Sequence, residues 1–135
     1  MSLVTQDELD QSGKSFAIHG TKTEYINSIL AEGLIAGASQ LHNHRRHQRD
    51  RTHIHFSDQY PFEGKVPGCR NESNVYIVVN ISRLIRLGHE IWRCENGYLL
   101  TRTIIKPDNF YVVIRKDDGV HLHRNWDLLH EVADH

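Results

Sequence analysis

Polar and apolar side chains alternate along residues 51–57, which read Arg-Thr-His-Ile-His-Phe-Ser. This alternation is typical of a strand with one buried face, with Arg51, His53 and His55 on one side and Ile54 and Phe56 on the other. A guanidinium can bind phosphate or carboxylate through two nitrogens, and imidazoles offer further hydrogen bonds. The stretch therefore predicts one wall of a binding cleft. The alternative is a solvated polar face on an edge strand.

A second candidate is His19-Gly20-Thr21, between a strand expected over Phe16–His19 and a helix expected over Thr23–Glu32. A strand-to-helix junction presents unpaired backbone N–H groups and a partial positive charge. Gly20 lets a ligand approach the backbone, and the two flanking side chains can bind hydroxyls or phosphate. An ordinary structural turn is the alternative interpretation, because many such junctions contain glycine.

The third candidate is Arg93-Cys94-Glu95-Asn96-Gly97. Asn-Gly is a strong tight-turn signal, so Arg93 is expected at the end of a strand beside that turn. Cys94 has no evident base nearby and is interpreted as a small packed residue rather than a nucleophile.

Five histidines, at positions 42, 44, 47, 53 and 55, include two His-x-His pairs and raise the alternative of a metal site. Zinc needs a third and usually a fourth rigid ligand, and neither Cys-x-x-Cys nor His-Glu-x-x-His occurs. The surrounding cationic run also disfavours a divalent ion. We therefore predict no metal site.

The composition is that of one globular domain of 135 residues, 39% hydrophobic and 24% charged. The net charge of −1 excludes an overall basic field for nucleic acid, so any phosphate contact must come from a local patch. Cys69 and Cys94 are expected to be free thiols. The absence of a signal-like or long apolar segment predicts a soluble, intracellular protein without membrane contact.

The remaining patterns predict an α+β domain with one or two mostly antiparallel sheets. Residues 1–15 are expected to be a flexible lead-in with a short helix over Thr5–Asp10, and residues 16–135 a single domain. The helix expected over Thr23–Glu32 should be capped by Thr21 or Thr23 and should end at Gly33. Further expected elements are a central strand Val75–Val79, a helix Ile81–Leu87 capped by Asn80, strands Glu90–Arg93, Tyr98–Thr103 (with Ile104-Ile105 as an extension) and Phe110–Ile114, a helix Trp126–Ala133, and loops over Ile35–Asp50 and Asp58–Asn74.

In their order along the chain, these motifs resemble the catalytic lobe of the NAD-dependent RNA 2′-phosphotransferases, a family of the ADP-ribosyltransferase superfamily. The resemblance covers about 100 residues and fades after Ile114. It implies an ADP-ribosyltransferase-like fold, with two antiparallel sheets splayed around an NAD cleft. It rests on His19-Gly20-Thr21, the helix up to Gly33-Leu34, Arg51-x-His53-Ile54-His55-Phe56-Ser57, Gly68-x-Arg70, Val75–Val79 and Arg93-Cys94-x-Asn96-Gly97-Tyr98-Leu99-Leu100-Thr101.

The resemblance also implies roles for individual residues. His19 would bind a ribose of NAD, the Gly20 backbone would hold the nicotinamide amide, and Thr21 would support the same wall. The implied catalytic residues are Arg51, His55, His19 and Arg93. Arg51 would handle the substrate phosphate. His55 would take the second position of the superfamily's three-residue signature, and the third would fall near Tyr98, where this family has an apolar residue rather than a catalytic Glu. His53 and Ser57 would line the cleft, and Arg93 and Asn96 would edge it. The implied cofactor-binding residues are thus His19, Gly20, Thr21, His53, His55, Ser57, Asn96 and Tyr98. This interpretation requires His19 and His55 to lie close together.

The family's reaction suits a site without a carboxylate base. A 2′-phosphate attacks NAD and releases nicotinamide; the ribose 2″-hydroxyl then attacks the phosphorus, giving a 2′-hydroxyl RNA and ADP-ribose 1″,2″-cyclic phosphate. The phosphate is already anionic, so the protein mainly has to orient it and the NAD.

The sequence departs from the family at its start. Family members carry an N-terminal winged-helix lobe that supplies an Arg-His pair and a further Arg to the phosphate site. Only 18 residues precede His19, and none of them is Arg or His. We therefore expect either a separate lobe that acts in trans or a narrower activity. Arg45, Arg46 and Arg49 are the candidates to replace the missing phosphate contacts.

The leading hypothesis is thus NAD-dependent ADP-ribosyl transfer to a phosphate-bearing acceptor, with NAD as cofactor and 2′-phosphorylated RNA as the suggested partner. One alternative is a non-catalytic module that binds NAD, ADP-ribose or an RNA end. Another is an effector that ADP-ribosylates proteins.

Overall fold

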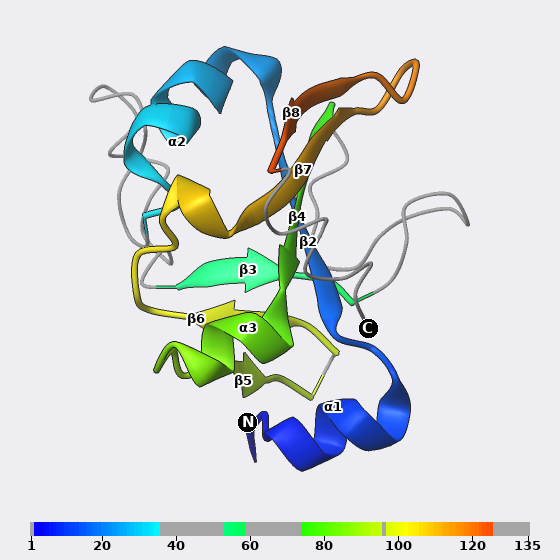
Figure 1. Ribbon diagram of the computed structural model, residues 1–135, viewed down its shortest axis with the longest axis vertical. Coiled ribbons are helices and arrows are strands. Elements are labelled where there is room, and N and C mark those ends of the chain that lie inside the picture. Colours follow the sequence, from blue (N-terminus) through cyan, green and yellow to red (C-terminus); the bar gives the residue numbers. More distant parts are fainter. Residues whose placement is uncertain (1, 36–52, 59–73, 96, 126–135) are drawn as a thin grey trace.

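The computed structural model describes residues 2–35, 53–58, 74–95 and 97–125. Within them the chain forms two four-stranded antiparallel sheets and three short α-helices, which confirms the predicted α+β class. Sheet A has the strand order β1-β5-β6-β3 and sheet B the order β2-β4-β7-β8. In Figure 1, β3, β6 and β5 of sheet A run roughly horizontally, while β2, β4 and β7 of sheet B run between the top and the bottom of the picture. The strands are β1 (Ser2–Leu3), β2 (Phe16–Thr21), β3 (Ile54–Phe56), β4 (Val75–Asn80), β5 (Trp92–Arg93), β6 (Leu99–Thr101), β7 (Phe110–Arg115) and β8 (His121–Arg124); the helices are α1 (Gln6–Ser12), α2 (Ile26–Glu32) and α3 (Ile81–Arg86).

Strand β4 lies inside sheet B between β2 and β7, as its run of β-branched residues predicts. Directly paired residues of antiparallel strands share a face. Ala17 pairs with Val79, and Ile77 pairs with both His19 and Val113. These apolar residues are completely buried, so this face of sheet B is its core face.

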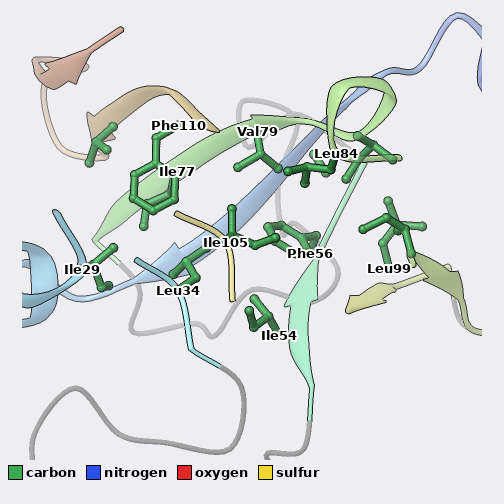
Figure 2. Packing of buried hydrophobic residues seen from close by; sticks show 14 of the residues in the cluster. Ile29, Leu34, Ile54, Phe56, Ile77, Val79, Leu84, Leu99, Ile105 and Phe110 are labelled. Atoms are coloured by element: carbon green, nitrogen blue, oxygen red, sulfur yellow. The ribbon is translucent and has the colours of Figure 1, made fainter. Parts of the chain in front are cut away.

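In sheet A, Phe56 pairs with Leu99, which also pairs with Arg93. Phe56 and Leu99 are buried and belong to the same core cluster as the residues of sheet B. Figure 2 shows this cluster between the strands, with Phe56 of sheet A, Val79 of sheet B and Ile105 among its labelled members. Burial of one such large side chain contributes roughly 1.5–3 kcal/mol to stability. The other face of sheet A carries His55, Leu100 and Trp92, which pair in one row across β3, β6 and β5.

The two sheets meet at their edge strands, β2 and β3. Ile18 N–H donates to the Ser57 carbonyl at 2.7 Å, and Ser57 N–H donates to the Ile18 carbonyl at 2.9 Å. This bridge is isolated, and on its Gly20 side the two strands pair no further within the described residues. The point of divergence lies between the two sequence motifs around His19 and His55.

The helix boundaries follow their local signals in two of three cases. Thr5 accepts a hydrogen bond from Glu8 N–H at the start of α1, and the side chain of Asn80 accepts one from Arg83 N–H at the start of α3, as predicted. The expected Thr cap of the second helix was wrong. That helix begins with a 3₁₀ turn over Thr23–Tyr25 without a side-chain cap, because the N–H and Oγ1 of Thr23 both donate to Asn74 Oδ1, at 2.8 and 3.1 Å. Gly33 ends α2 with φ +94°, as predicted.

Several strand predictions need correction. Strand β2 does not end before Gly20 but continues to Thr21, because β4 extends alongside and pairs with both residues. Phe110–Arg115 is followed by another strand, β8, whose polar sequence gave little signal. Ile105 does not extend β6; it forms a bridge with Leu34 instead. Ser2 and Leu3 form β1, and Val4 and Leu9 of the expected lead-in are buried in the core.

Other predictions lie outside the described residues: the loops over 36–50 and 59–73, the start of the strand at Arg51 and Thr52, Asn96, Cys69 and the helix over 126–133. Cys94 is a free thiol. In the part of the chain that the structure describes, no helix is long and apolar enough to cross a membrane.

Candidate functional site

His19 and β3 meet directly, as the sequence-based interpretation requires. His19 Nδ1 lies 2.8 Å from the carbonyl oxygen of His55. A carbonyl only accepts hydrogen bonds, so Nδ1 carries the proton, and in the neutral ring Nε2 is then an acceptor. The ring also contacts Phe56 edge-on, with centroids 5.8 Å apart. Both contacts fix the orientation of the imidazole where β2 and β3 diverge.

The bond explains how the two strands separate. Next to the Ile18–Ser57 bridge, a continued antiparallel ladder would pair Gly20 with His55. The ladder stops at one bridge, and the His19 side chain reaches the His55 carbonyl instead. Backbone groups of residues i and i+2 point to the same edge of a strand, so Gly20 N–H and C=O point toward β3, as those of Ile18 do. The Gly20 backbone is therefore directed toward the place where β2 and β3 no longer pair, which we call the opening.

The alternation predicted for β3 is confirmed where the strand is described. Ile54 and Phe56 are buried at 4% and 0% exposure, while His53 and His55 are half-buried on the other face. Ser57 continues the histidine side and is itself buried. Arg51, which the sequence places on the same face, lies outside the described residues.

The same face of sheet A gathers further side chains that the sequence did not connect. We call it the histidine face; its described members are His53, His55, Ser57, Trp92, Tyr98, Leu100 and Arg102. Trp92, Leu100 and His55 form one row by register. Tyr98 and Arg102 flank β6, two residues to either side of Leu100, and so fall on its side by strand alternation. Of the predicted cofactor-binding residues, the structure thus brings His53, His55, Ser57 and Tyr98 together.

Arg102 makes a specific contact on this face. Its Nε donates to His53 Nε2 at 3.1 Å, so that His53 carries its proton on Nδ1. Sequence reasoning missed Arg102 and Trp92. Their alternation with Tyr98, Leu100 and Cys94 is visible in the sequence, but the pairing of β3, β6 and β5 that unites them is not.

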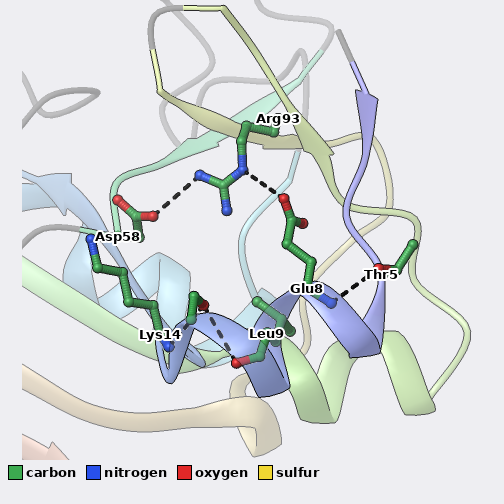
Figure 3. Close-up of polar contacts among 7 residues, drawn as sticks. Thr5, Glu8, Leu9, Lys14, Asp58 and Arg93 are labelled. Atoms are coloured by element: carbon green, nitrogen blue, oxygen red, sulfur yellow. Dashed lines mark hydrogen bonds and ion pairs between the residues drawn. The ribbon is translucent and has the colours of Figure 1, made fainter.

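Arg93 occupies a different environment. It pairs with Leu99, so it shares the face of Phe56 rather than that of His55. Its Nε donates to Glu8 Oε1 at 3.3 Å and its Nη1 to Asp58 Oδ2 at 3.2 Å, as Figure 3 shows. Two carboxylates around one guanidinium leave the cluster with a net charge of −1. The structure therefore does not place Arg93 beside His53 and His55, and its predicted catalytic role stays a prediction.

Gly20 and Thr21 are half-buried residues of β2. Thr21 pairs with Val75, and its carbonyl accepts a hydrogen bond from Asn74 N–H at 3.0 Å. Strand alternation places Thr21 on the same face as His19, two residues further along the strand. Both therefore border the opening beyond the Ile18–Ser57 bridge.

The remaining predicted site residues are not described: Arg45, Arg46, Arg49 and Arg51 for phosphate, and Asn96 for the cofactor. Within residues 2–35, 53–58, 74–95 and 97–125, no group of three His, Cys, Asp or Glu side chains could hold a metal ion.

The sheets and the site define an α+β protein with a histidine-lined junction between two antiparallel sheets. Residues 2–103 match the family "RNA 2′-phosphotransferase, Tpt1 / KptA family". The matched segment includes β1 to β6 and both histidine motifs. The chain belongs to this RNA 2′-phosphotransferase family.

Individual relatives agree with this membership. The chain is 30% identical over 95 residues to a probable RNA 2′-phosphotransferase of Shigella boydii serotype 18 and to one of Escherichia coli strain K12. A third, from Escherichia coli O6:K15:H31, is 29% identical over 96 residues. The first two alignments cover 70% of this chain and the third 71%, but each covers only 45% of the relative. The chain thus spans about half the length of the curated relatives it matches.

Proposed function

We propose that this chain transfers ADP-ribose from NAD to a phosphate-bearing acceptor, in the manner of an RNA 2′-phosphotransferase, and that its two sheets form an ADP-ribosyltransferase-like fold. Family membership supports the reaction class. The observation that carries the proposal is the hydrogen bond from His19 to the His55 carbonyl, because it joins the two predicted NAD motifs at one opening.

The NAD side of the site follows from backbone and imidazole geometry. With Nδ1 of His19 held by His55, Nε2 presents an acceptor for a ribose hydroxyl. The N–H and C=O of Gly20 point toward the same opening. A primary amide such as that of nicotinamide complements this donor and acceptor pair, so Gly20 is suited to orient the leaving group.

The reaction needs little acid–base chemistry from the protein. A phosphate oxygen forms a bond to C1″ of the nicotinamide ribose while the C1″–N bond breaks and nicotinamide leaves as a neutral molecule. The 2″-hydroxyl then attacks the phosphorus and the RNA 2′-oxygen leaves, taking up the proton that the 2″-hydroxyl releases. The products are nicotinamide, RNA with a 2′-hydroxyl and ADP-ribose 1″,2″-cyclic phosphate.

Tyr98 supports a phosphate acceptor over an alcohol or a protein side chain. By the family resemblance, it would stand near the position where many protein-modifying relatives of the superfamily carry a catalytic Glu. An alcohol needs such a base to lose its proton, whereas a phosphate is already ionised. A site with Tyr98 there is consistent with the phosphate.

Nicotinamide release tests this proposal. The protein is incubated with NAD and an oligonucleotide carrying one 2′-phosphate, and the matched 2′-hydroxyl oligonucleotide serves as control. We expect release only with the phosphate. Equal release with both oligonucleotides, or none with either, contradicts the proposal.

One observation favours a second candidate, a module that binds NAD or ADP-ribose without turnover. Arg93, a predicted catalytic residue, is engaged by Glu8 and Asp58 on the face away from His55. Calorimetry with NAD and ADP-ribose distinguishes the candidates: binding of either ligand without nicotinamide release supports the module.

A further inference from the structure

We propose that Arg102, oriented by His53, is a phosphate-binding residue of the histidine face. This inference rests on the proposed function only for the source of the phosphate, which is either the acceptor or the pyrophosphate of NAD. The sequence-based candidates for phosphate were Arg45, Arg46, Arg49 and Arg51, and Arg102 was not among them.

Register places Arg102 beside the predicted cofactor residues. Ile54 pairs with Thr101 and His55 with Leu100, so the next position on each strand brings His53 opposite Arg102. Residues two apart on a strand lie roughly 7 Å apart on the same face. Arg102 is therefore one row away from His55, within reach of a ligand of nucleotide size.

The contact with His53 fixes the guanidinium and leaves its binding edge open. Nε of Arg102 donates to His53 Nε2 at 3.1 Å, and the side chain is exposed. The terminal nitrogens Nη1 and Nη2 donate to no other described residue. These two nitrogens form the planar fork that matches two oxygens of a phosphate.

The bonding partners of Arg102 differ in charge from those of two other arginines of the fold. Arg93 is bound by two carboxylates, and Arg115 by Asp118 through two hydrogen bonds of 3.0 and 2.6 Å. Arg102 forms no ion pair with a described carboxylate; its partner is an imidazole that accepts without cancelling the positive charge. Its full charge therefore remains available to an anion.

Arg124 provides a matched control. Its Nε donates to His121 Nδ1 at 2.8 Å on β8, which repeats the Arg–His contact on the other sheet. The test compares wild type, Arg102→Gln, Arg102→Lys and Arg124→Gln at one salt concentration. Dissociation constants are measured for the 2′-phosphorylated oligonucleotide, for its 2′-hydroxyl counterpart and for NAD, with thermal unfolding as the check on folding.

We expect Arg102→Gln to weaken binding of one phosphate ligand by about tenfold, the loss that removal of a charge-assisted contact produces. A loss confined to the 2′-phosphorylated oligonucleotide assigns the acceptor phosphate, and a loss confined to NAD assigns the pyrophosphate. Arg102→Lys should retain part of the affinity because it keeps the charge without the fork. Arg124→Gln should bind like wild type.

The inference is wrong if Arg102→Gln binds both phosphate ligands like wild type, if Arg124→Gln loses as much affinity, or if wild type binds neither ligand. Nicotinamide release is scored separately. Wild type that binds phosphate through Arg102 but releases no nicotinamide would end the proposed function and leave this inference standing.

Discussion

The Nδ1 atom of His19 and the carbonyl oxygen of His55 are 2.8 Å apart, and this contact replaces the backbone pairing that β2 and β3 would otherwise continue. The His19 side chain thereby satisfies the His55 carbonyl at the place where the pairing of the two strands stops. The same contact leaves the Gly20 backbone facing the opening. The structural role of His19 and its proposed role toward NAD are thus carried by different ring nitrogens.

These two roles can be separated by substitution. His19→Asn keeps a donor near the position of Nδ1 but has no counterpart of Nε2, whereas His19→Ala loses both. We expect both variants to lose about tenfold or more in kcat/KM for NAD, since each removes the proposed hydrogen bond between Nε2 and a ribose hydroxyl. In urea unfolding, only His19→Ala should lose stability. Equal kcat/KM for His19→Asn and wild type would show that Nε2 has no role toward NAD.

The ion-pair cluster around Arg93 should contribute to stability unequally. The Asp58 side chain is 14% exposed and that of Glu8 is 41% exposed, so water screens the Glu8 pair more strongly. Asp58→Ala leaves the Arg93 guanidinium, itself 28% exposed, without its more buried partner. We expect a loss of about 1–3 kcal/mol for Asp58→Ala and under about 1 kcal/mol for Glu8→Ala, measured by urea unfolding. The reverse order would show that α1, rather than Asp58, anchors Arg93.

Gly33 permits a close approach that no other residue type allows. Its φ is +94°, and a Cβ added there would overlap the carbonyl oxygen of Ile105, the residue that Leu34 bridges. Gly88 has a similar φ of +99° with open space around the added Cβ. Gly88→Ala should therefore cost about 1–2 kcal/mol from backbone strain alone, and Gly33→Ala clearly more. Equal losses in the free energy of unfolding would show that Ile105 moves aside easily.

Acid should weaken the fold partly through His89. Burial lowers the pKa of His89 below its usual value, and its Nδ1 contacts Thr103 Oγ1 at 2.5 Å. The unfolded chain therefore binds the proton more readily than the folded one, so the contribution of His89 is complete above the unfolded pKa of about 6.5 and declines as the pH falls through it. His89→Asn should show a smaller drop in urea midpoint than wild type between pH 7.5 and pH 5.5. Parallel drops would assign the acid sensitivity to other groups.

Local sequence signals predicted much of the fold. The β-branched run of β4, the Asn80 cap and Gly33 at the end of α2 all act within a few residues, so their consequences could be read directly. The alternation of His53 to Phe56 likewise gave the correct faces. Strand β8 escaped prediction because its sequence, His-Leu-His-Arg, is stabilised by pairing with β7 rather than by its own composition.

The contacts around the candidate site could be predicted from the sequence only in part. The sequence could suggest that His19 and β3 meet through the family resemblance, but not that the contact is made to a backbone carbonyl. The partners of Arg93 come from α1, 85 residues earlier in the chain, and from Asp58, which a residue-type pattern does not connect to it. Arg102 and His53 are 49 residues apart and meet only through the β3–β6 register.

The most direct measurement is the mass of a 2′-phosphorylated oligonucleotide after incubation with the protein and NAD. We expect NAD-dependent conversion: the oligonucleotide gains ADP-ribose on its phosphate or loses the phosphate to ADP-ribose 1″,2″-cyclic phosphate. His19→Asn should show far less of either product. An oligonucleotide of unchanged mass with folded wild-type protein and saturating NAD would contradict the central claim.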